Sequence, residues 1–467
     1  MRIQNHAPSA VFFRTLSVAL IFASLLFPVA AQTPAREERL LNGLRIFFFQ
    51  RPGAQKVWMR LRVGSGAAFD LAGKEGTARL LADALFPDPS TGQYVAEELG
   101  GRLDVRADYD ATEITISGDA ARFDSLVEVV RNALLQMRLT PDEVRRLKEA
   151  RAKLLGGQAE TAAAKADRAA AARLFGSYPY ARAAEGTAES IARVERADLM
   201  LARDRFLNPN NSLLVVVGPV ETTRAMRVFR QFLGPWRKSD EIVPATFRQP
   251  AAPDPRALVV AVPGATEAEV RLAVRGLPRS DNDHRALAGL AIVARQRWLA
   301  ALKDVAPEKV FARHEPHALA GLFRMGATVP TPRAAEAVES ARGALRSLAT
   351  TPVTAAEFET ARRELSASSQ NARDPEYASA EDWLDSLAHG RPAGDSPRAF
   401  ETLTPGDIQR IAARLFRDAA VAAVVACDAA ALRASLAGLP GGIEEVPAGK
   451  AAPAAPSQTT PDAGRRP

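Results

Sequence analysis

The chain has 467 residues, of which 47% are apolar and 25% charged, so it can bury a large core over roughly two to four domains. This composition excludes fibrous, collagen-like and wholly disordered chains. A single cysteine excludes a disulfide framework and any zinc site built on several cysteines. The 61 basic and 54 acidic residues are interspersed along the chain, so the net charge of +7 forms no basic tract and argues against nucleic-acid binding.

The N-terminus has the pattern of a secretory signal peptide. Arg2 and Arg14 flank a polar start, and an apolar run from Leu16 to Phe27 leads to small residues that end at Ala31. A run of about 12 residues is shorter than the ~20 that span a bilayer. We therefore expect cleavage after Ala31 and a periplasmic or secreted protein that has no membrane association once residues 1–31 are removed.

The remaining elements follow in chain order. Alternating apolar residues predict a strand at 57–66, helical spacing follows at 76–86, and 103–118 is predicted to form two strands joined by an acidic, solvated turn at 108–110. Further helices are predicted at 122–137, 141–175 and 190–206, before a strand at 212–218. This mixture lacks strict βαβ alternation, which favours an α+β fold whose mainly antiparallel sheet is covered on one face by helices.

The chain also repeats itself at long range. The segment that begins at Leu139 matches the one at Val353 with an offset of 214 residues, and the segment around Asp198 matches that around Asp407 with an offset of 209. A similar order at a fixed period indicates duplication. We predict two homologous α/β sandwich repeats, at 32–235 and 257–439, joined by a Pro-rich linker at 236–256 and followed by a disordered tail at 440–467.

Three stretches carry a resemblance to a known family: residues 62–86, 98–118 and 176–220. In order and spacing they resemble the strand, active-site helix, strand pair and Gly-Thr segment of the pitrilysin/insulinase zinc metallopeptidases. The chain is similar above all to the short two-domain members, such as the mitochondrial processing peptidase subunits, over roughly residues 37–430. The resemblance implies the same duplicated, processing-peptidase-like fold.

Catalysis in this family depends on an H-x-x-E-H motif in which two His bind zinc and the Glu activates water, with a downstream Glu as the third ligand. The corresponding positions here are Arg79, Ala82 and Asp83, and matching the downstream helix places Leu154 at the third ligand. Both His and both Glu are absent. The resemblance therefore implies a non-catalytic member without a bound metal or other cofactor.

The histidines offer one alternative metal site. The chain has five, of which four follow residue 31, and only His314 and His317 lie close together. Pro316 between them disfavours the helical spacing of a zinc-binding pair, so an exposed polar loop is the simpler interpretation.

A partner is implied by the same resemblance, because two-domain members work as an active and an inactive subunit that close around an unfolded peptide. The inactive subunit commonly supplies an Arg and a Tyr, which correspond here to Lys303 and Phe311. Lys303 lacks the planar donor fork and Phe311 lacks the hydroxyl. Arg297, Arg313 or Arg324 can supply a guanidinium instead.

Three hypotheses follow. The first is a non-catalytic subunit of an exported zinc peptidase, which forms a heterodimeric chamber with an active homologue and helps bind extended peptide. The second is a peptidase scaffold reused as a binding or structural protein, as in core subunits of the mitochondrial respiratory complex. The third is a metallopeptidase whose metal site has moved to His314 and His317.

Overall fold

The computed structural model describes residues 36–157, 160–240, 242–244, 246–370, 375–391, 403–428 and 443–446. The predicted signal peptide at 1–31 lies outside these residues, as does most of the predicted tail. Within the described ranges no helix is long and apolar enough to cross a membrane. The regular structure is built around two six-stranded sheets, one from each half of the chain.

The first sheet has the strand order β1-β2-β6-β3-β5-β4. Its strands are β1 (Arg36–Arg39), β2 (Arg45–Gln50), β3 (Lys56–Val63), β4 (Arg102–Ala107), β5 (Thr112–Asp119) and β6 (Ser212–Gly218). Only the β2–β6 pair is parallel. The sheet is therefore mainly antiparallel, as predicted.

Helices of the same half follow the strands. They are α2 (Thr77–Leu85), α3 (Pro89–Glu97), α4 (Phe123–Leu135), α5 (Pro141–Gly156), α6 (Ala162–Phe175), α7 (Ala188–Arg193), α8 (Arg196–Phe206) and α9 (Thr222–Leu233). The start of α5 shows how the sequence sets these bounds: Thr140 and Glu143 form a capping box, with Pro141 in the first turn. Apolar residues of α4 and α9 pack with alternate residues of β2, β3 and β5 on one face of the sheet.

The second sheet repeats this arrangement with the order β12-β7-β11-β8-β10-β9. Its strands are β7 (Ala257–Ala261), β8 (Glu267–Gly276), β9 (Val310–Glu315), β10 (Gly321–Pro330), β11 (Ala422–Cys427) and β12 (Ile443–Val446), and its helices are α10 (Ala286–Ala301), α11 (Ala334–Thr350), α12 (Ala355–Gln370), α13 (Pro375–Ala388) and α14 (Pro405–Phe416). Five strands in each sheet correspond in order, which is the duplication predicted from the sequence. One correction concerns the tail: its residues 443–446 form β12, which pairs with β7.

Short 3₁₀ helices connect these elements: η1 (Ala67–Phe69), η2 (Ala120–Arg122), η3 (Pro179–Ala181), η4 (Pro209–Asn211), η5 (Pro307–Lys309) and η6 (Thr331–Arg333). The predicted linker at 236–256 lies between α9, which ends at Leu233, and β7, which begins at Ala257.

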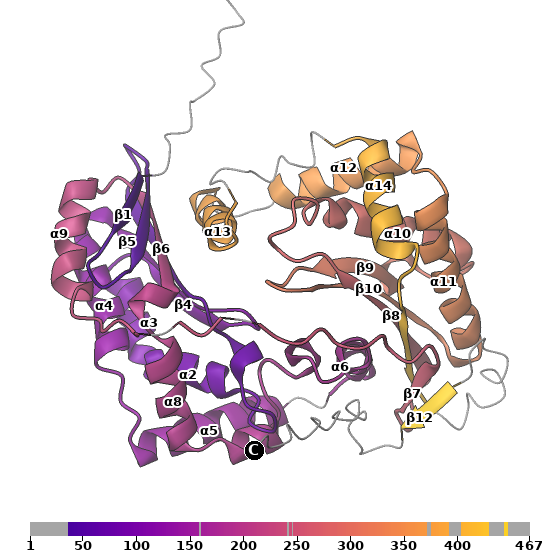
Figure 1. Ribbon diagram of the computed structural model, residues 1–467, viewed down its shortest axis with the longest axis horizontal. Coiled ribbons are helices and arrows are strands. Elements are labelled where there is room, and N and C mark those ends of the chain that lie inside the picture. Colours follow the sequence, from indigo (N-terminus) through magenta and orange to yellow (C-terminus); the bar gives the residue numbers. More distant parts are fainter. Residues whose placement is uncertain are drawn as a thin grey trace, which may run out of the picture. The chain divides into compact units, whose positions relative to one another are not determined.

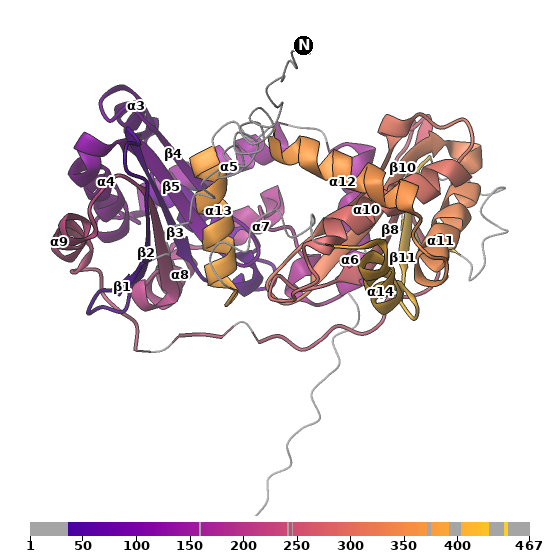
Figure 2. The same ribbon diagram turned by 90° about the horizontal axis from the view of Figure 1, so that it is seen from above.

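The second face of each sheet is covered by a helix from the other repeat (Figures 1 and 2). Helix α13 packs on the first sheet, where the Trp383 ring stacks on Phe49 with centroids 3.6 Å apart. Helix α6 packs on the second sheet, where Ala170 and Leu174 join the cluster that includes Val424. The two helices are equivalent in the duplication. The sequence patterns predicted helices on one face only, because amphipathicity does not show which sheet a helix covers.

Buried charges lie where each of these two helices packs on the sheet of the other repeat. Arg60 of β3 is 1% exposed, and its guanidinium lies 2.9 Å from Glu113 and 3.5 Å from Glu381 of α13. At the equivalent position of β8, Arg271 is 3% exposed and lies 2.5 Å from Asp167 of α6. An arginine in each sheet thus pairs with an acid on the helix from the other repeat.

Replacement of Trp383 by Ala tests how far α13, which packs on the sheet of the other repeat, stabilises the protein. Removing a side chain that is 5% exposed and stacked on Phe49 should lower the free energy of unfolding by about 3 kcal/mol. Tyr94→Ala, at a position that is 44% exposed, is the matched control and should change it by less than about 0.5 kcal/mol. Urea denaturation measures both, and equal small effects would contradict the packing role of α13.

Candidate functional site

Helix α2 contains the positions that the family resemblance assigns to the catalytic motif, and Asp70 fixes where the helix begins. The Asp70 carboxylate accepts hydrogen bonds from the backbone N–H groups of Gly76 and Ala78, at 2.8 and 2.9 Å. Burial raises the pKa of this carboxyl to about 7, although both N–H donors lower it. The carboxylate thus satisfies donors at the helix N-terminus that have no partner within the helix.

Two of the predicted motif residues belong to an ion-pair cluster, which we define as Arg79, Asp83, Arg151 and Glu185. Arg79 and Asp83 pair within α2 at 3.1 Å. From α5, Arg151 donates to both carboxylate oxygens of Asp83 at 2.8 and 2.6 Å and to Glu185 at 3.0 Å. Arg79 also lies 3.6 Å from Glu185. The cluster holds two cations and two anions, and each arginine contacts both acids.

The other two predicted positions have different environments. Ala82 is buried in α2 with 1% exposure, so it belongs to the packed side of the helix. Leu154 is 66% exposed and lines a cleft of about 560 Å³ outside the cluster. The α5 residue that contacts Asp83 is Arg151, three residues before Leu154. Sequence matching along α5 missed Arg151, because α5 carries several basic residues and the sequence does not show which of them faces Asp83.

The cluster has little capacity to bind a metal. Guanidinium groups carry only N–H donors and a permanent positive charge, so Arg79 and Arg151 offer no lone pair to a cation. Both carboxylates are already engaged by these arginines. Among the described residues, no group of three or more His, Cys, Asp or Glu is placed to hold a metal ion.

The two close histidines are half-buried and have different neighbours, which corrects the expectation of an exposed polar loop. On β9, the Nε2 atom of His314 is buried without a hydrogen-bond partner in the described structure, against Gly276 and Gly321. The His317 ring instead packs against both Tyr109 and Tyr180, with centroids 5.2 and 4.6 Å away. Burial lowers the pKa of His314 to about 3 and that of His317 as well.

The acidic turn at 108–110 also makes hydrogen bonds within the protein, which corrects the expectation of a solvated turn. Asp110 accepts a 2.5 Å hydrogen bond from the Tyr180 hydroxyl and a 2.8 Å bond from the backbone N–H of Ala318 in the second repeat. Asp108 accepts from the backbone N–H groups of Asp110 and Ala111 and closes the turn. Sequence reasoning missed the link because Tyr180 and Ala318 are distant along the chain.

The predicted peptide-binding residues lie on two elements. Lys303 is exposed after α10, and its backbone carbonyl accepts a 2.7 Å bond from Arg333. Phe311 lies on β9, where the guanidinium groups of Arg271 and Arg313 are 5.1 and 4.9 Å from its ring centroid. The structure therefore surrounds the aromatic position with arginines.

The three alternative arginines differ in their surroundings. Arg297 binds Glu357 at 2.7 Å and carbonyls at the end of α11, which is a structural role. Arg324 is 6% exposed and pairs with Asp167 at 3.2 Å and with Glu315. Arg313 pairs with Glu315 at 2.8 Å but keeps 48% of its side chain exposed. Of the three, Arg313 has the most exposed side chain, and its guanidinium lies beside Phe311.

Comparison with known proteins agrees with this architecture. A family model described as the peptidase M16 inactive domain matches residues 193–365. A protease from Helicobacter pylori has a similar structure, with a TM-score of 0.75 and 18% identity over 84% of this chain and 99% of that one. A peptidase M16 inactive domain from Pseudomonas fluorescens gives 0.74 and 17% over 84% and 98%. The first half of the periplasmic protease PqqL from Escherichia coli gives 0.67 and 15% over 87% and 95%.

The fold is thus that of the M16 peptidases, two α/β repeats in one chain. The family model that matches the sequence, over residues 193–365 only, is the one for the inactive domain. No curated protein matches its sequence.

Asp83→Ala tests the ion-pair cluster. The substitution leaves Arg151, which is 8% exposed, with Glu185 as its remaining partner, so the free energy of unfolding should fall by about 2 kcal/mol. The matched control is Asp142→Ala, which breaks an exposed pair with Arg145 at 3.0 Å and should cost less than about 0.5 kcal/mol. Chemical denaturation distinguishes the two, and a neutral Asp83→Ala would contradict the arrangement.

Two histidines, His284 and His314, predict that the protein loses stability in acid. Burial lowers the pKa of His284 to about 4 and that of His314 to about 3, whereas the unfolded chain protonates near 6.5. The two neutral histidines contribute their full stability above pH 6.5. As the pH falls below 6.5, the free energy of unfolding decreases by at most about 1.4 kcal/mol per pH unit for each histidine. Asp70, whose pKa is raised, opposes this between pH 7 and 4.

Comparison with the double variant His284→Gln/His314→Gln isolates the histidine contribution. Denaturation midpoints measured from pH 7 to 5 should fall less steeply in the variant than in the parent. Parallel pH profiles would show that the two histidines do not carry the acid sensitivity.

Proposed function

We propose that this chain is a non-catalytic subunit of an exported pitrilysin/insulinase-type zinc peptidase, and that it forms half of a peptide-binding chamber with an active partner. The observation that carries the proposal is the ion-pair cluster at the motif positions of α2. Arg79 stands at the first metal-ligand position, Ala82 at the catalytic base, and Asp83 is held by Arg151.

The side chains at the motif positions of α2 give a physical reason why this helix would not bind zinc. A zinc ion needs deprotonated ligands in an open coordination shell. Two guanidinium groups in the cluster repel a cation, and release of Asp83 for a metal would leave Arg151, which is 8% exposed, without its main partner. The alanine at position 82 has no group that can accept a proton from water. The cluster is a stable substitute for a metal site.

The structural similarity to one half of a longer protease supports a role as one half of an assembly. The chain covers 95% of the first half of PqqL but 48% of the complete PqqL chain, which is described as a periplasmic protease. We propose that an intact zinc-peptidase homologue supplies the other half of the chamber. The expected signal peptide and the periplasmic relative support an exported location.

Phe311 and Arg313 are proposed to contribute to peptide binding. The two residues are separated by one position on β9, so their side chains lie on the same face of the sheet. The Arg313 guanidinium lies 4.9 Å from the Phe311 ring and is half-exposed. Its Nε and Nη2 atoms pair with Glu315 and Asp167, so Nη1 is the atom that we propose donates to a peptide carbonyl. Lys303 retains a cation at the position that the family resemblance indicates, as a secondary contact.

Co-expression with the nearest intact H-x-x-E-H homologue tests the proposal. We expect a stable heterodimer and at least about tenfold faster cleavage of an unstructured peptide than by the homologue alone, because the completed chamber holds the substrate in place. In the heterodimer, Phe311→Ala/Arg313→Gln should raise KM several-fold with little change in kcat. Arg146→Gln, an exposed substitution on α5, is the control.

Two outcomes would contradict the proposal. Equal cleavage by the homologue with and without this chain would favour a reused binding or structural scaffold instead. Cleavage by this chain alone that requires His314 and His317 would favour the relocated metal site.

A further inference from the structure

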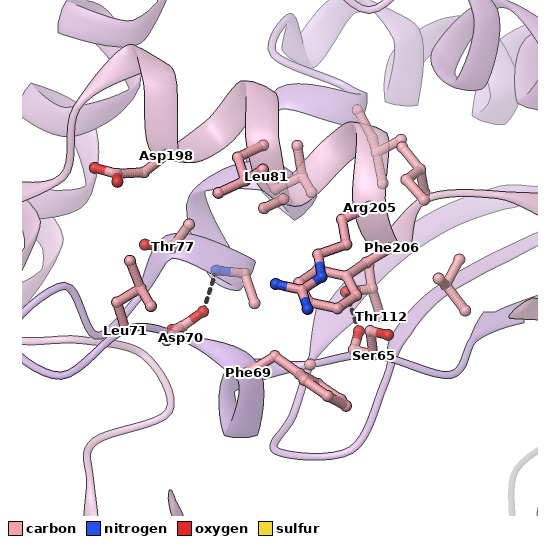
Figure 3. Close-up of a pocket in the computed structure, with 17 residues that line it drawn as sticks. Ser65, Phe69, Asp70, Leu71, Thr77, Leu81, Thr112, Asp198, Arg205 and Phe206 are labelled. Atoms are coloured by element: carbon pink, nitrogen blue, oxygen red, sulfur yellow. Dashed lines mark hydrogen bonds between the residues drawn. The ribbon is translucent and has the colours of Figure 1, made fainter. Parts of the chain in front are cut away.

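A small apolar pocket lies beside α2, between α8 and the segment that follows β3 (Figure 3). Its volume is about 80 Å³. The lining includes the buried side chains of Val63, Leu85 and Leu207, whereas Leu71 and Leu201 are each 58% exposed. The pocket therefore has a buried apolar floor and an exposed apolar rim.

This pocket is separate from the ion-pair cluster. Ala78, Leu81 and Leu85 line the pocket from α2. At 3.6 residues per turn, these positions occupy one side of the helix, and Arg79 and Asp83 occupy the opposite side. A ligand in the pocket thus lies on the side of the helix opposite to Arg79 and Asp83.

The charges around the pocket leave one cation available. The carboxylate of Asp70 is occupied by two backbone N–H groups, and Asp198 pairs with Lys74 at 2.6 Å. Arg205 is exposed, points into the pocket in Figure 3, and has no ion-pair partner within the described part of the chain. Its guanidinium lies 5.6 Å from the Phe206 ring centroid, so the neighbouring aromatic ring helps to hold it in place.

We propose that this pocket binds the C-terminal residue of a polypeptide, with an apolar side chain on the buried floor and the terminal carboxylate paired with Arg205. The volume is well below the ~300 Å³ of pockets for drug-sized ligands and suits a single aliphatic side chain. The cation is in the wall of the same small pocket, so the carboxylate must lie within a few bonds of the apolar group.

A C-terminal residue meets this requirement more directly than an internal acidic residue. Its carboxylate and its side chain are attached to one Cα, so insertion of the side chain places the carboxylate at the rim. A bidentate guanidinium–carboxylate pair is among the stronger polar contacts and fixes the orientation of the chain end. The site goes beyond the proposed chamber, because it needs neither the active partner nor Phe311 and Arg313.

Small probes test the site on the full chain. Titration calorimetry would compare N-acetyl-leucine with N-acetyl-leucinamide, which lacks the carboxylate, with N-acetylglycine, which lacks the side chain, and with 4-methylpentanoate, which lacks the amide. We expect N-acetyl-leucine to bind saturably with a millimolar Kd, and the other three probes to bind at least about fivefold more weakly.

Matched variants connect the binding to the pocket. Arg205→Gln should abolish the preference for acid over amide, and Leu201→Asp should weaken N-acetyl-leucine by placing a negative charge at the rim. Both side chains are exposed, so unchanged thermal unfolding is expected, and Arg146→Gln should bind as the parent does. An equal affinity for acid and amide in the parent, or a preference retained by Arg205→Gln, would overturn the proposal. Tighter binding of 4-methylpentanoate would assign the pocket to a free aliphatic acid instead of a chain end.

Discussion

A buried arginine near the middle of each sheet requires acidic partners, and the fold supplies one of them from the other repeat. Arg60 and Arg271 occupy equivalent positions on β3 and β8, and both are almost fully buried on the face that the repeat's own helices leave uncovered. A buried guanidinium is costly unless it is paired. The pairing acids include Glu381 and Asp167, each on the helix contributed by the other repeat. Neither sheet completes its apolar or its charged contacts within its own half of the chain.

The same principle of paired charges applies to the ion-pair cluster between α2 and α5. In the family that the sequence resembles, a zinc ion joins the two equivalent helices through bonds to both. Here Arg151 of α5 binds Asp83 of α2 through two guanidinium nitrogens, Nε and Nη2, and also contacts Glu185, so charge pairs connect the helices. The surfaces that we propose for binding, beside Phe311 and behind α2, lie outside this cluster.

Part of this structure follows from the sequence and part does not. The offset of 214 residues between Leu139 and Val353 was enough to predict the duplication, because a repeat is visible without knowledge of contacts. Which sheet α13 covers was not predictable, since an apolar stripe does not specify the sheet on which it packs. Arg151 was missed for a related reason: matching along α5 selected Leu154, whereas the contact with Asp83 is made one helical turn earlier. Sequence patterns specify elements, and pairings between distant elements require the fold.

Zinc content and intrinsic peptide hydrolysis of the purified chain test the central claim most directly. After dialysis without a chelator, elemental analysis should find far less than one zinc ion per chain, and an unstructured peptide should remain uncut. One equivalent of zinc that survives dialysis, together with hydrolysis that chelation abolishes and zinc restores, would contradict the account of a peptidase scaffold in which charge pairs have replaced the metal.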